Sequence, residues 1–351
     1  MRNIIRTVIV VGLAVGLIAL FLRNADLSRV WAHVKAARPD YLFLSLAATG
    51  VSFLIRAERW QYLLSPLGPT HYWTVFRTTV IGFGASAVLP ARAGEVIRPY
   101  LLARREGLNA MAAFATILVE RILDLVAVLT LMAAFLIWFD PGMASRDSAV
   151  FSAIRFGALV MWPVAILALA VMFFMAGHPD KLHAGVLKAE RVLPAKVAAM
   201  IARFAKTFAE GFAVVRRPER LLAAIGWSIV LWIMIASGIW ATSVAFGIAM
   251  PFTGAWLMLG PLVVGVAVPT PGGVGGVHEA YRIGATAFFG ADNDTAVGAA
   301  IVVHAISVVP VTIAGLLFMV QDGLNLGGLT EHNIKGDIGD GAKTMDKGAT
   351  P

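Results

Sequence analysis

Long apolar stretches separated by short polar ones run through almost the whole chain, and this pattern limits the folds open to it. Hydrophobic residues make up 59% of the 351 residues and charged residues only 14%, with a mean hydropathy of +0.79. A soluble domain has about a quarter of its residues charged. Several of the stretches reach or approach the roughly 20 residues that a spanning helix needs. The sequence therefore predicts an all-α polytopic membrane protein, with no polar stretch long enough to form a separate soluble domain.

We expect about six transmembrane helices. The first apolar run follows Arg2 and Arg6 and would also suit a cleaved signal peptide, but no clear small-x-small cleavage site follows it, so a spanning helix is favoured. Residues 26–38 have the pattern of an interfacial helix, with Asp26 as its N-cap and Pro39 as its end. The expected spans are residues 7–22, 42–64, 110–139, 155–176, 221–249 and 297–320.

Three residues near the end of the second span are of types that favour a membrane surface. Arg56, Arg59 and Trp60 fall in its last three turns. Long basic side chains can snorkel to the headgroup region, and Trp can anchor a helix there. We therefore expect all three at the membrane–water interface.

Two further apolar stretches are too short to cross a bilayer and are interrupted by proline and glycine. The first covers residues 78–106 and breaks at 90–99, and the second covers residues 255–290 and breaks at 269–276. Irregular backbone at membrane depth is tolerated only where protein or a water-filled cavity surrounds it. We therefore predict two re-entrant broken-helix hairpins, a kind of segment that tends to line binding sites.

The two hairpins share a pattern that suggests an inverted repeat. After its break, the first contains Glu95 and Arg98, and the second contains Glu279 and Arg282, in each case as Glu-x-x-Arg. A long apolar helix with polar groups in it follows each hairpin. Paired broken segments in corresponding positions of two halves indicate a transport site. Two short matches can also arise by chance, so the repeat remains a hypothesis at this point.

Basic residues, 29 against 21 acidic ones, are concentrated in the stretches that a cytoplasmic N-terminus places inside. This bias predicts cytoplasmic N- and C-termini in a protein of the cell (cytoplasmic) membrane. The first hairpin then enters from inside and the second from outside. The basic segment 177–220 is expected to be cytoplasmic and amphipathic, lying on the membrane surface or on the protein itself. Residues 1–320 form the expected membrane domain, and residues 321–351 a disordered cytoplasmic tail.

The order and spacing of four motifs resemble a known family. The chain is similar, over about residues 5–320, to the flippase-like transmembrane region of lysylphosphatidylglycerol synthases, the multiple peptide resistance factors. The resemblance implies movement of a modified phospholipid or polyprenyl-linked lipid across the membrane. Those synthases carry a soluble aminoacyl-transfer domain after the membrane part, whereas a short tail follows it here, so synthase activity is not expected. The motifs are Arg56-Ala-Glu-Arg59-Trp60, Leu89-Pro90-Ala-Arg92-Ala-Gly94-Glu95-Val-Ile-Arg98, Glu120-Arg121-Ile-Leu-Asp124 and Pro269-Thr-Pro271-Gly272-Gly273-Val-Gly275-Gly276-Val-His-Glu279.

The third expected span carries three charges, Glu120, Arg121 and Asp124. Three unpaired charges near a bilayer centre would cost roughly 8–10 kcal/mol on insertion scales, so they must face protein or water. Their spacing of three and four residues lets all three share one helix face. They form either a headgroup or proton site, or a structural ion pair with Arg92 or Arg98.

The first break places Arg92, Glu95 and Arg98 beside a glycine. Arginine suits bidentate binding of phosphate, which makes these three residues candidates for a lipid headgroup site. The alternative is a cytoplasmic cluster that touches lipid headgroups without specificity. We favour the site because the cluster lies on a broken helix.

The second break offers a glycine-rich loop and the N-terminus of the helix that follows it. Backbone N–H groups in such a loop can bind an anion, although the Gly-Lys-[Ser/Thr] ending of a P-loop is absent. Alternatively, the glycines allow tight helix packing. Glu279 is the strongest single candidate, with Arg282 beside it. His278 and His304 lack a His-Glu-x-x-His motif, so a metal site is not favoured. The loop glycines are Gly272, Gly273, Gly275 and Gly276.

Three functions remain open from the sequence. The favoured one is a lipid translocase whose partners are membrane lipids, an anionic phospholipid or a lipid-linked headgroup. A membrane-embedded transferase or hydrolase would use Glu95 and Glu279 for acid–base work, but no nucleotide, metal or nucleophile motif supports an enzyme or a cofactor. A non-transporting accessory subunit would instead dock a lipid-modifying enzyme on segment 177–220. Nucleic acid is not an expected partner, because no basic block accompanies a foldable soluble module.

Overall fold

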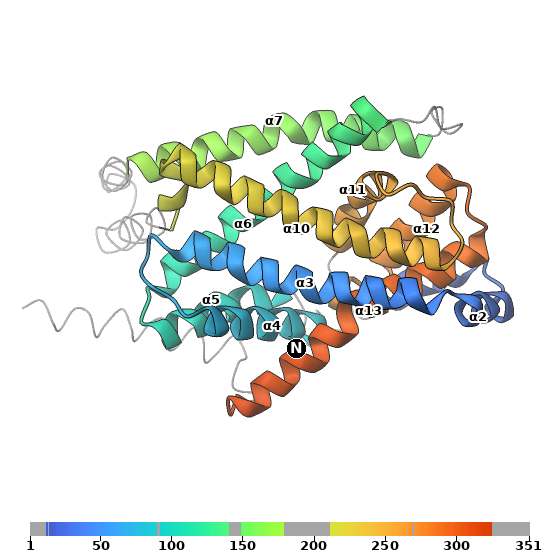
Figure 1. Ribbon diagram of the computed structural model, residues 1–351, viewed down its shortest axis with the longest axis horizontal. Helices are drawn as coiled ribbons and strands as arrows, with labels where there is room; N and C mark the ends of the chain where they lie inside the picture. The colour runs from blue at the N-terminus through green and yellow to red at the C-terminus, as the bar shows by residue number, and fades with distance from the viewer. Residues whose placement is uncertain are drawn as a thin grey trace, which may run out of the picture.

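The computed structural model describes residues 12, 14–89, 92–139, 149–178, 211–268 and 270–324, and within these all regular secondary structure is helical (Figure 1). An all-α membrane protein is therefore confirmed. Among the described residues, three helices are long and apolar enough to cross a bilayer. They are α3 (Pro39–Leu64), α10 (Pro218–Ala245) and α13 (Asn293–Gln321).

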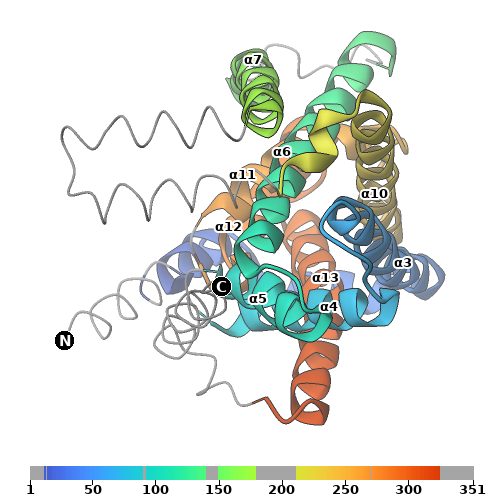
Figure 2. The same cartoon turned by 90° about the vertical axis from the view of Figure 1, so that its left-hand side faces the viewer.

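Two more long helices belong to the bundle. α6 (Ala110–Ala134) continues into a π-helical turn at Phe135–Phe139 and carries the three predicted intramembrane charges. α7 (Ala149–Gly177) packs against α6 on the outside of the bundle, as Figure 2 shows. Exposed side chains such as Phe156, Leu159 and Leu167 cover α7, which suits contact with lipid.

Both expected broken-helix hairpins are present. In the first, α4 (Tyr72–Val88) packs against α5 (Gly94–Glu106). In the second, α11 (Gly254–Ala267) packs against α12 (Gly276–Phe289). These limbs have 13 to 17 residues, fewer than the roughly 20 that would cross a bilayer.

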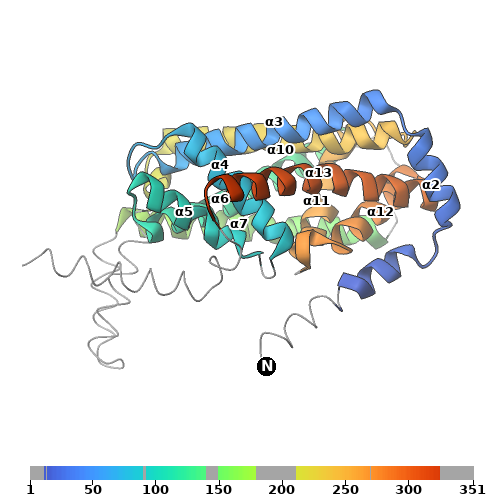
Figure 3. The same ribbon diagram turned by 90° about the horizontal axis from the view of Figure 1, so that it is seen from below.

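The order of elements recurs along the chain: α3, α4, α5 and α6 are matched by α10, α11, α12 and α13. The two leading helices lie side by side in opposite directions (Figure 3). Ser45 Oγ donates to Gly238 O at 2.9 Å near one end, and Arg59 Nη1 donates to Ser228 Oγ at 2.9 Å near the other. The halves therefore share an order of elements and run in opposite senses, as an inverted repeat requires.

The hairpins enter the bundle from opposite ends, and their tips meet inside it. α4 and α5 lie at the end where α3 finishes, whereas α11 and α12 lie at the other end (Figure 1). The Arg92 guanidinium at the first tip donates to the carbonyl oxygen of Val266, near the end of α11. α4 also contacts the 3-10 turn Pro271–Gly273 of the second tip. The tips therefore form one junction.

Each hairpin is closed by a contact between two glycines. A Cβ on Gly94 would collide with the carbonyl oxygen of Gly82, and a Cβ on Gly276 would collide with that of Gly265. The limbs can approach this closely only because these residues have no side chain. The equivalent glycine contacts further support a structural repeat that includes both hairpins.

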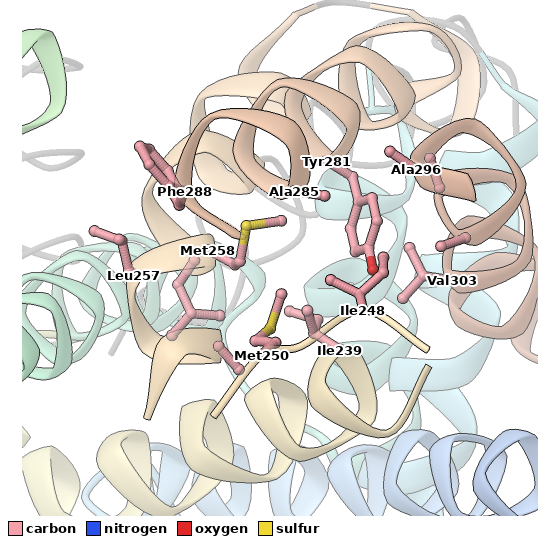
Figure 4. Close-up of a cluster of buried hydrophobic side chains, with 14 of the residues drawn as sticks. Ile239, Ile248, Met250, Leu257, Met258, Tyr281, Ala285, Phe288, Ala296 and Val303 are labelled. Atoms are coloured by element: carbon pink, nitrogen blue, oxygen red, sulfur yellow. The ribbon is translucent and has the colours of Figure 1, made fainter. Parts of the chain in front are cut away.

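A large hydrophobic cluster holds the second hairpin against α10 and α13. Figure 4 shows Tyr281, Met258 and Phe288 packed among side chains from these helices. Tyr281 is fully buried, and its hydroxyl lies 2.6 Å from Ser243 Oγ on α10. A buried Tyr hydroxyl normally has such a partner. The cluster therefore anchors α12 firmly, although its first turn is at the hairpin tip.

The N-cap of the expected interfacial helix is confirmed. α2 (Leu27–Ala36) is capped by Asp26, whose side chain accepts from two backbone N–H groups. The helix packs on α13 with Val30 buried and Trp31 exposed. Much of three other predicted segments lies outside the described residues: the start of the first span, most of 177–220, and 325–351 of the tail.

The start of the expected tail, 321–351, is joined to the first hairpin by ion pairs. α13 continues to Gln321, and Asp322 accepts ion pairs from Arg77 at 2.9 Å and from Arg105 at 2.6 Å. These pairs fasten the end of α13 to both limbs of the first hairpin.

Candidate functional site

A cavity of about 500 Å³ lies where the two hairpin tips meet. It is lined by both hairpins and by α3, α6, α10 and α13, so each half of the repeat contributes to it. Its wall is polar at the first hairpin and along α3, and mainly apolar along α11. The polar lining residues include Ser45, Thr49, Ser52, Arg56, Ser86, Arg92, Glu95, Arg98, Arg121, Asp124, Trp232, Thr270, His304 and Ser307.

Glu120 is the centre of the charged wall and is fully buried. Its Oε1 atom lies 2.8 Å from Arg121 Nη2 and 3.1 Å from Arg98 Nη1. The same oxygen lies 3.4 Å from Arg59 Nη2 and 3.8 Å from Arg56 Nη1. Four guanidinium groups from α3, α5 and α6 therefore share one carboxylate oxygen.

Asp124, one turn further along α6, provides the second carboxylate. Its Oδ1 accepts from Arg59 Nη1 at 2.5 Å and from Trp232 Nε1 at 2.9 Å. Its Oδ2 lies 3.6 Å from Arg121 Nη1. Asp124 thereby links α3, α6 and α10 across the floor of the cavity.

Two of these arginines, Arg56 and Arg98, contact aromatic rings as well as carboxylates. The Arg98 guanidinium carbon lies 3.7 Å from the centroid of the buried Trp60 ring. Arg56 lies over Phe83 at 4.7 Å. Trp60 in turn donates from Nε1 to Thr116 Oγ1 at 3.0 Å. Such contacts orient a desolvated cation without neutralising it.

Comparison with known proteins identifies the family of this chain. The profile of the family described as the lysylphosphatidylglycerol synthase TM region matches residues 3–315, nearly the whole chain. The chain belongs to the lysylphosphatidylglycerol synthase transmembrane region family. The family resemblance stated from the motifs is thus confirmed.

Individual relatives extend the comparison within this family. A UPF0104 membrane protein of Methanothermobacter thermautotrophicus is 21% identical, over 92% of this chain and 94% of that protein. A UPF0104 membrane protein of Methanocaldococcus jannaschii is 28% identical over 24% of this chain and 26% of its own length. Glycosyltransferase AglD of Haloferax volcanii is 29% identical over 38% of this chain and 22% of its own length. The last two matches therefore cover only a part of each protein.

Three side chains of the family motif Arg56-Ala-Glu-Arg59-Trp60 are buried inside the protein, whereas exposure to the headgroup region was expected for them. Arg59 and Trp60 are completely buried, and Arg56 is 8% exposed. The acidic partners on α6 and the rings of α3 and α4 keep these side chains inside. One sequence signal pointed to this: Ser45, Thr49, Ser52 and Arg56 follow helical spacing and form a polar stripe, and Arg59 continues it.

The structure brings seven of the twelve predicted site residues to the cavity wall, and Glu120 lies directly behind them. Arg92 has a left-handed φ of 52° and ties the two tips together through Val266. It also lies 3.8 Å from Glu95. The Arg98–Glu120 contact matches the structural ion pair considered from the sequence. The seven are Arg92, Glu95, Arg98, Arg121, Asp124, Gly272 and Gly273.

The strongest sequence candidate, Glu279, does not belong to the described lining of the cavity. Its carboxylate is held by Arg282 one turn along α12, with Arg282 Nε donating at 2.8 Å. Arg282 Nη1 also donates to Asn293 Oδ1 at 3.2 Å. The pair therefore fastens α12 to the start of α13.

The helix register explains why the two Glu-x-x-Arg motifs differ. Glu95 follows the glycine contact at Gly94 by one residue, whereas Glu279 follows that at Gly276 by three. Two residues turn a helical side chain through about 200°. Val277, not Glu279, therefore occupies the place of Glu95 in the cavity wall.

The glycine-rich loop is only partly free to bind an anion. Its Gly273 N–H donates to Thr270 O at 3.1 Å, and its Gly275 N–H donates to His278 Nδ1 at 3.1 Å. Gly276 serves the contact between the limbs. Gly272, Gly273 and Gly275 all have positive φ, so the loop needs glycine for its shape.

Two imidazole rings lie beside the cavity. The rings of His278 and His304 have centroids 4.4 Å apart, and Phe21 packs on His278. Within the part of the chain that the structure describes, no group of three or more metal-ligating side chains forms. The rings connect the second tip to α13.

Proposed function

We propose that the chain moves a lipid headgroup across the cytoplasmic membrane. The observation that carries the proposal is the cavity at the junction of two hairpin tips, which has arginines on one wall and mainly apolar side chains elsewhere, inside a bundle of apolar helices. A charged headgroup crosses hydrocarbon only at a high energetic cost. The arginine-bearing wall of the cavity would lower that cost for the headgroup, while the acyl chains remain in the bilayer.

The architecture supports this proposal. Transporters built from inverted repeats bind their substrates where broken helices meet, and they alternate access by moving one repeat against the other. Here the two broken hairpins meet at the cavity, through the contact of Arg92 with Val266 and the contact of α4 with Pro271–Gly273. We further propose that both termini are cytoplasmic, so that the first hairpin opens towards the cytoplasm.

The headgroup site is proposed to consist of Arg56, Arg98 and Arg121, supported by Glu120 and Asp124. The hydroxyl groups of Ser45, Thr49 and Ser52 continue the polar wall along α3. Guanidinium groups bind phosphate through paired hydrogen bonds, which suits the phosphate common to membrane lipids.

A second candidate function is an accessory role beside a lipid-modifying enzyme. The partial match to a glycosyltransferase favours it, because it pairs a related stretch of chain with a named enzyme. In this case the chain would bind its lipid without moving it. Lipid movement by the purified protein would contradict this candidate.

The test measures lipid exchange between leaflets in proteoliposomes that contain the purified full chain. Lipids labelled on an acyl chain keep their natural headgroups, and a membrane-impermeant reductant bleaches the outer-leaflet label. We expect bleaching of more than the outer-leaflet half for the transported class only. Equal bleaching with and without protein for every anionic, zwitterionic and cationic headgroup would contradict a translocase.

Three variants sharpen this test. Arg121→Gln removes a cavity charge whose side chain is 37% exposed, and we expect it to slow exchange strongly. Arg104→Gln changes an exposed arginine at the other end of α5 and serves as the control. Glu279→Gln separates two expectations: the motif predicts loss of exchange, whereas its position outside the described cavity wall predicts that exchange is retained.

A further inference from the structure

We propose that the cavity is built for a phosphate monoester, a dianion, and that it disfavours headgroups with a positive charge. The inference rests on the proposed function, because it names the chemical class of that headgroup. It is drawn from the balance of charges and of hydrogen-bond donors around the cavity.

The charge balance is the first argument. Among the described residues of the cluster, the buried Arg56, Arg59 and Arg98 and the partly exposed Arg121 face only two carboxylates, those of Glu120 and Asp124. Arginine keeps its charge in proteins. The cluster therefore has an excess of two positive charges, and Arg92 and Glu95 at its edge balance each other.

A buried charge without compensation is destabilising. An excess of two is compensated by one group carrying two negative charges, such as a phosphate monoester above its second ionisation. A phosphodiester carries only one negative charge, so one positive charge of the cluster would remain uncompensated. A lysyl-bearing phosphodiester carries a net positive charge and increases the excess.

The hydrogen-bond balance is the second argument. Buried nitrogen atoms without a hydrogen-bond partner in the described structure include Arg56 Nε, Arg98 Nε, Arg98 Nη2 and Arg121 Nε. The unpartnered carboxylate oxygens of the cluster are Glu120 Oε2 and Asp124 Oδ2. Donors therefore outnumber acceptors. A phosphate monoester supplies three terminal oxygen acceptors, one more than a phosphodiester.

The second hairpin adds a neutral donor. Thr270 is 8% exposed, lines the cavity, and its hydroxyl has no partner among the described residues. Carboxylates that would attract an ammonium group are already engaged, since Asp124 is held by two arginines and Glu95 lies beside Arg92. Among the described residues, the lining thus offers more unpartnered donors to an anion than unpartnered carboxylate oxygens to a cation.

The test is equilibrium binding rather than transport. The purified full chain in detergent is titrated with short-chain phosphatidic acid, phosphatidylglycerol, lysylphosphatidylglycerol and inorganic phosphate. We expect phosphatidic acid to bind at least about tenfold more tightly than phosphatidylglycerol, and lysylphosphatidylglycerol to bind most weakly. Inorganic phosphate as tight as phosphatidic acid would support the dianion and assign it to a free phosphate instead of a lipid.

Variants of cavity and control arginines test whether the preference for phosphatidic acid comes from the cavity. Arg121→Gln should abolish the preference for phosphatidic acid, whereas Arg104→Gln should retain it. If Arg121→Gln does not fold, Arg56→Lys, which keeps the charge but removes donors, should reduce the preference. Lysylphosphatidylglycerol binding as tightly as phosphatidic acid would overturn the inference.

Failure of this inference is distinguishable from failure of the proposed function. Tight binding of phosphatidic acid without leaflet exchange would overturn translocation and leave the dianion site standing. Exchange of lysylphosphatidylglycerol in preference to phosphatidic acid would overturn the dianion site and leave translocation standing.

Discussion

Arg98 lies over Trp60, with its guanidinium carbon 3.7 Å from the centroid of the indole ring. The contact joins α5 of the first hairpin to α3, and both side chains are buried. A desolvated cation–π contact of this kind contributes about 2 kcal/mol. It fixes the tip of the hairpin while leaving part of the guanidinium free for a ligand.

The first prediction concerns this stacked arginine. Arg98→Lys keeps the charge but loses the planar stack and the paired donors. We expect the free energy of unfolding to fall by about 1–2 kcal/mol and leaflet exchange to slow more than tenfold. Thermal unfolding in detergent and the proteoliposome assay measure the two effects. Arg104→Lys, on the exposed side of the same helix, should change neither; equal effects for both variants would contradict the role of the stack.

The second prediction compares two glutamates. Glu120→Gln leaves four arginines without their shared carboxylate, and removing one partner of a buried charge cluster costs about 3–5 kcal/mol. Glu279→Gln breaks a partly exposed pair within one helix, for which we expect about 0.5 kcal/mol or less. Thermal unfolding of both variants in the same detergent tests the difference. Similar melting temperatures would show that Glu120 is not the centre of the cluster.

The third prediction concerns the glycine contacts. Gly94→Ala and Gly276→Ala place a methyl group against the backbone of the opposite limb, so each hairpin must open or shift. We expect a loss of several kcal/mol, comparable to other overpacked sites. Gly50→Ala and Gly226→Ala are controls, because no described atom lies within 4 Å of the added carbon. These should be neutral or stabilising by about 0.5–1 kcal/mol. Stable, folded Gly94→Ala protein would refute the close contact.

The fourth prediction tests the arrangement of the two halves. Ser45 Oγ and Thr242 Oγ1 lie 2.8 Å apart between α3 and α10. The chain has no cysteine, so a Ser45→Cys/Thr242→Cys double variant forms only the intended cross-link. We expect it to run faster on a denaturing gel after oxidation and to return to its original position on reduction. Each single variant should stay unchanged; failure of the double variant to cross-link in membranes would argue against antiparallel α3 and α10.

The two hairpins could be predicted from the sequence. Their short apolar limbs and the clusters of proline and glycine at 90–99 and 269–276 identify them, because such clusters favour a break in a helix. The charges of α6 were likewise predicted to face protein. Their partners were only partly predicted: Arg98 was among the alternatives, but Arg59 was expected at the membrane surface.

The sequence by itself determined that this protein is all-helical, lies in a membrane and contains two broken hairpins, since apolar length, helix breakers and caps act locally. Only the tertiary structure decided which charges meet. Arg59 and Asp124 are 65 residues apart, and their contact depends on how α3 packs against α6. Glu279 is outside the described lining of the cavity because the glycine contact sets the rotation of α12. Packing between distant segments fixes helix rotation, and a rotation of half a turn moves a charge from the cavity to the opposite face.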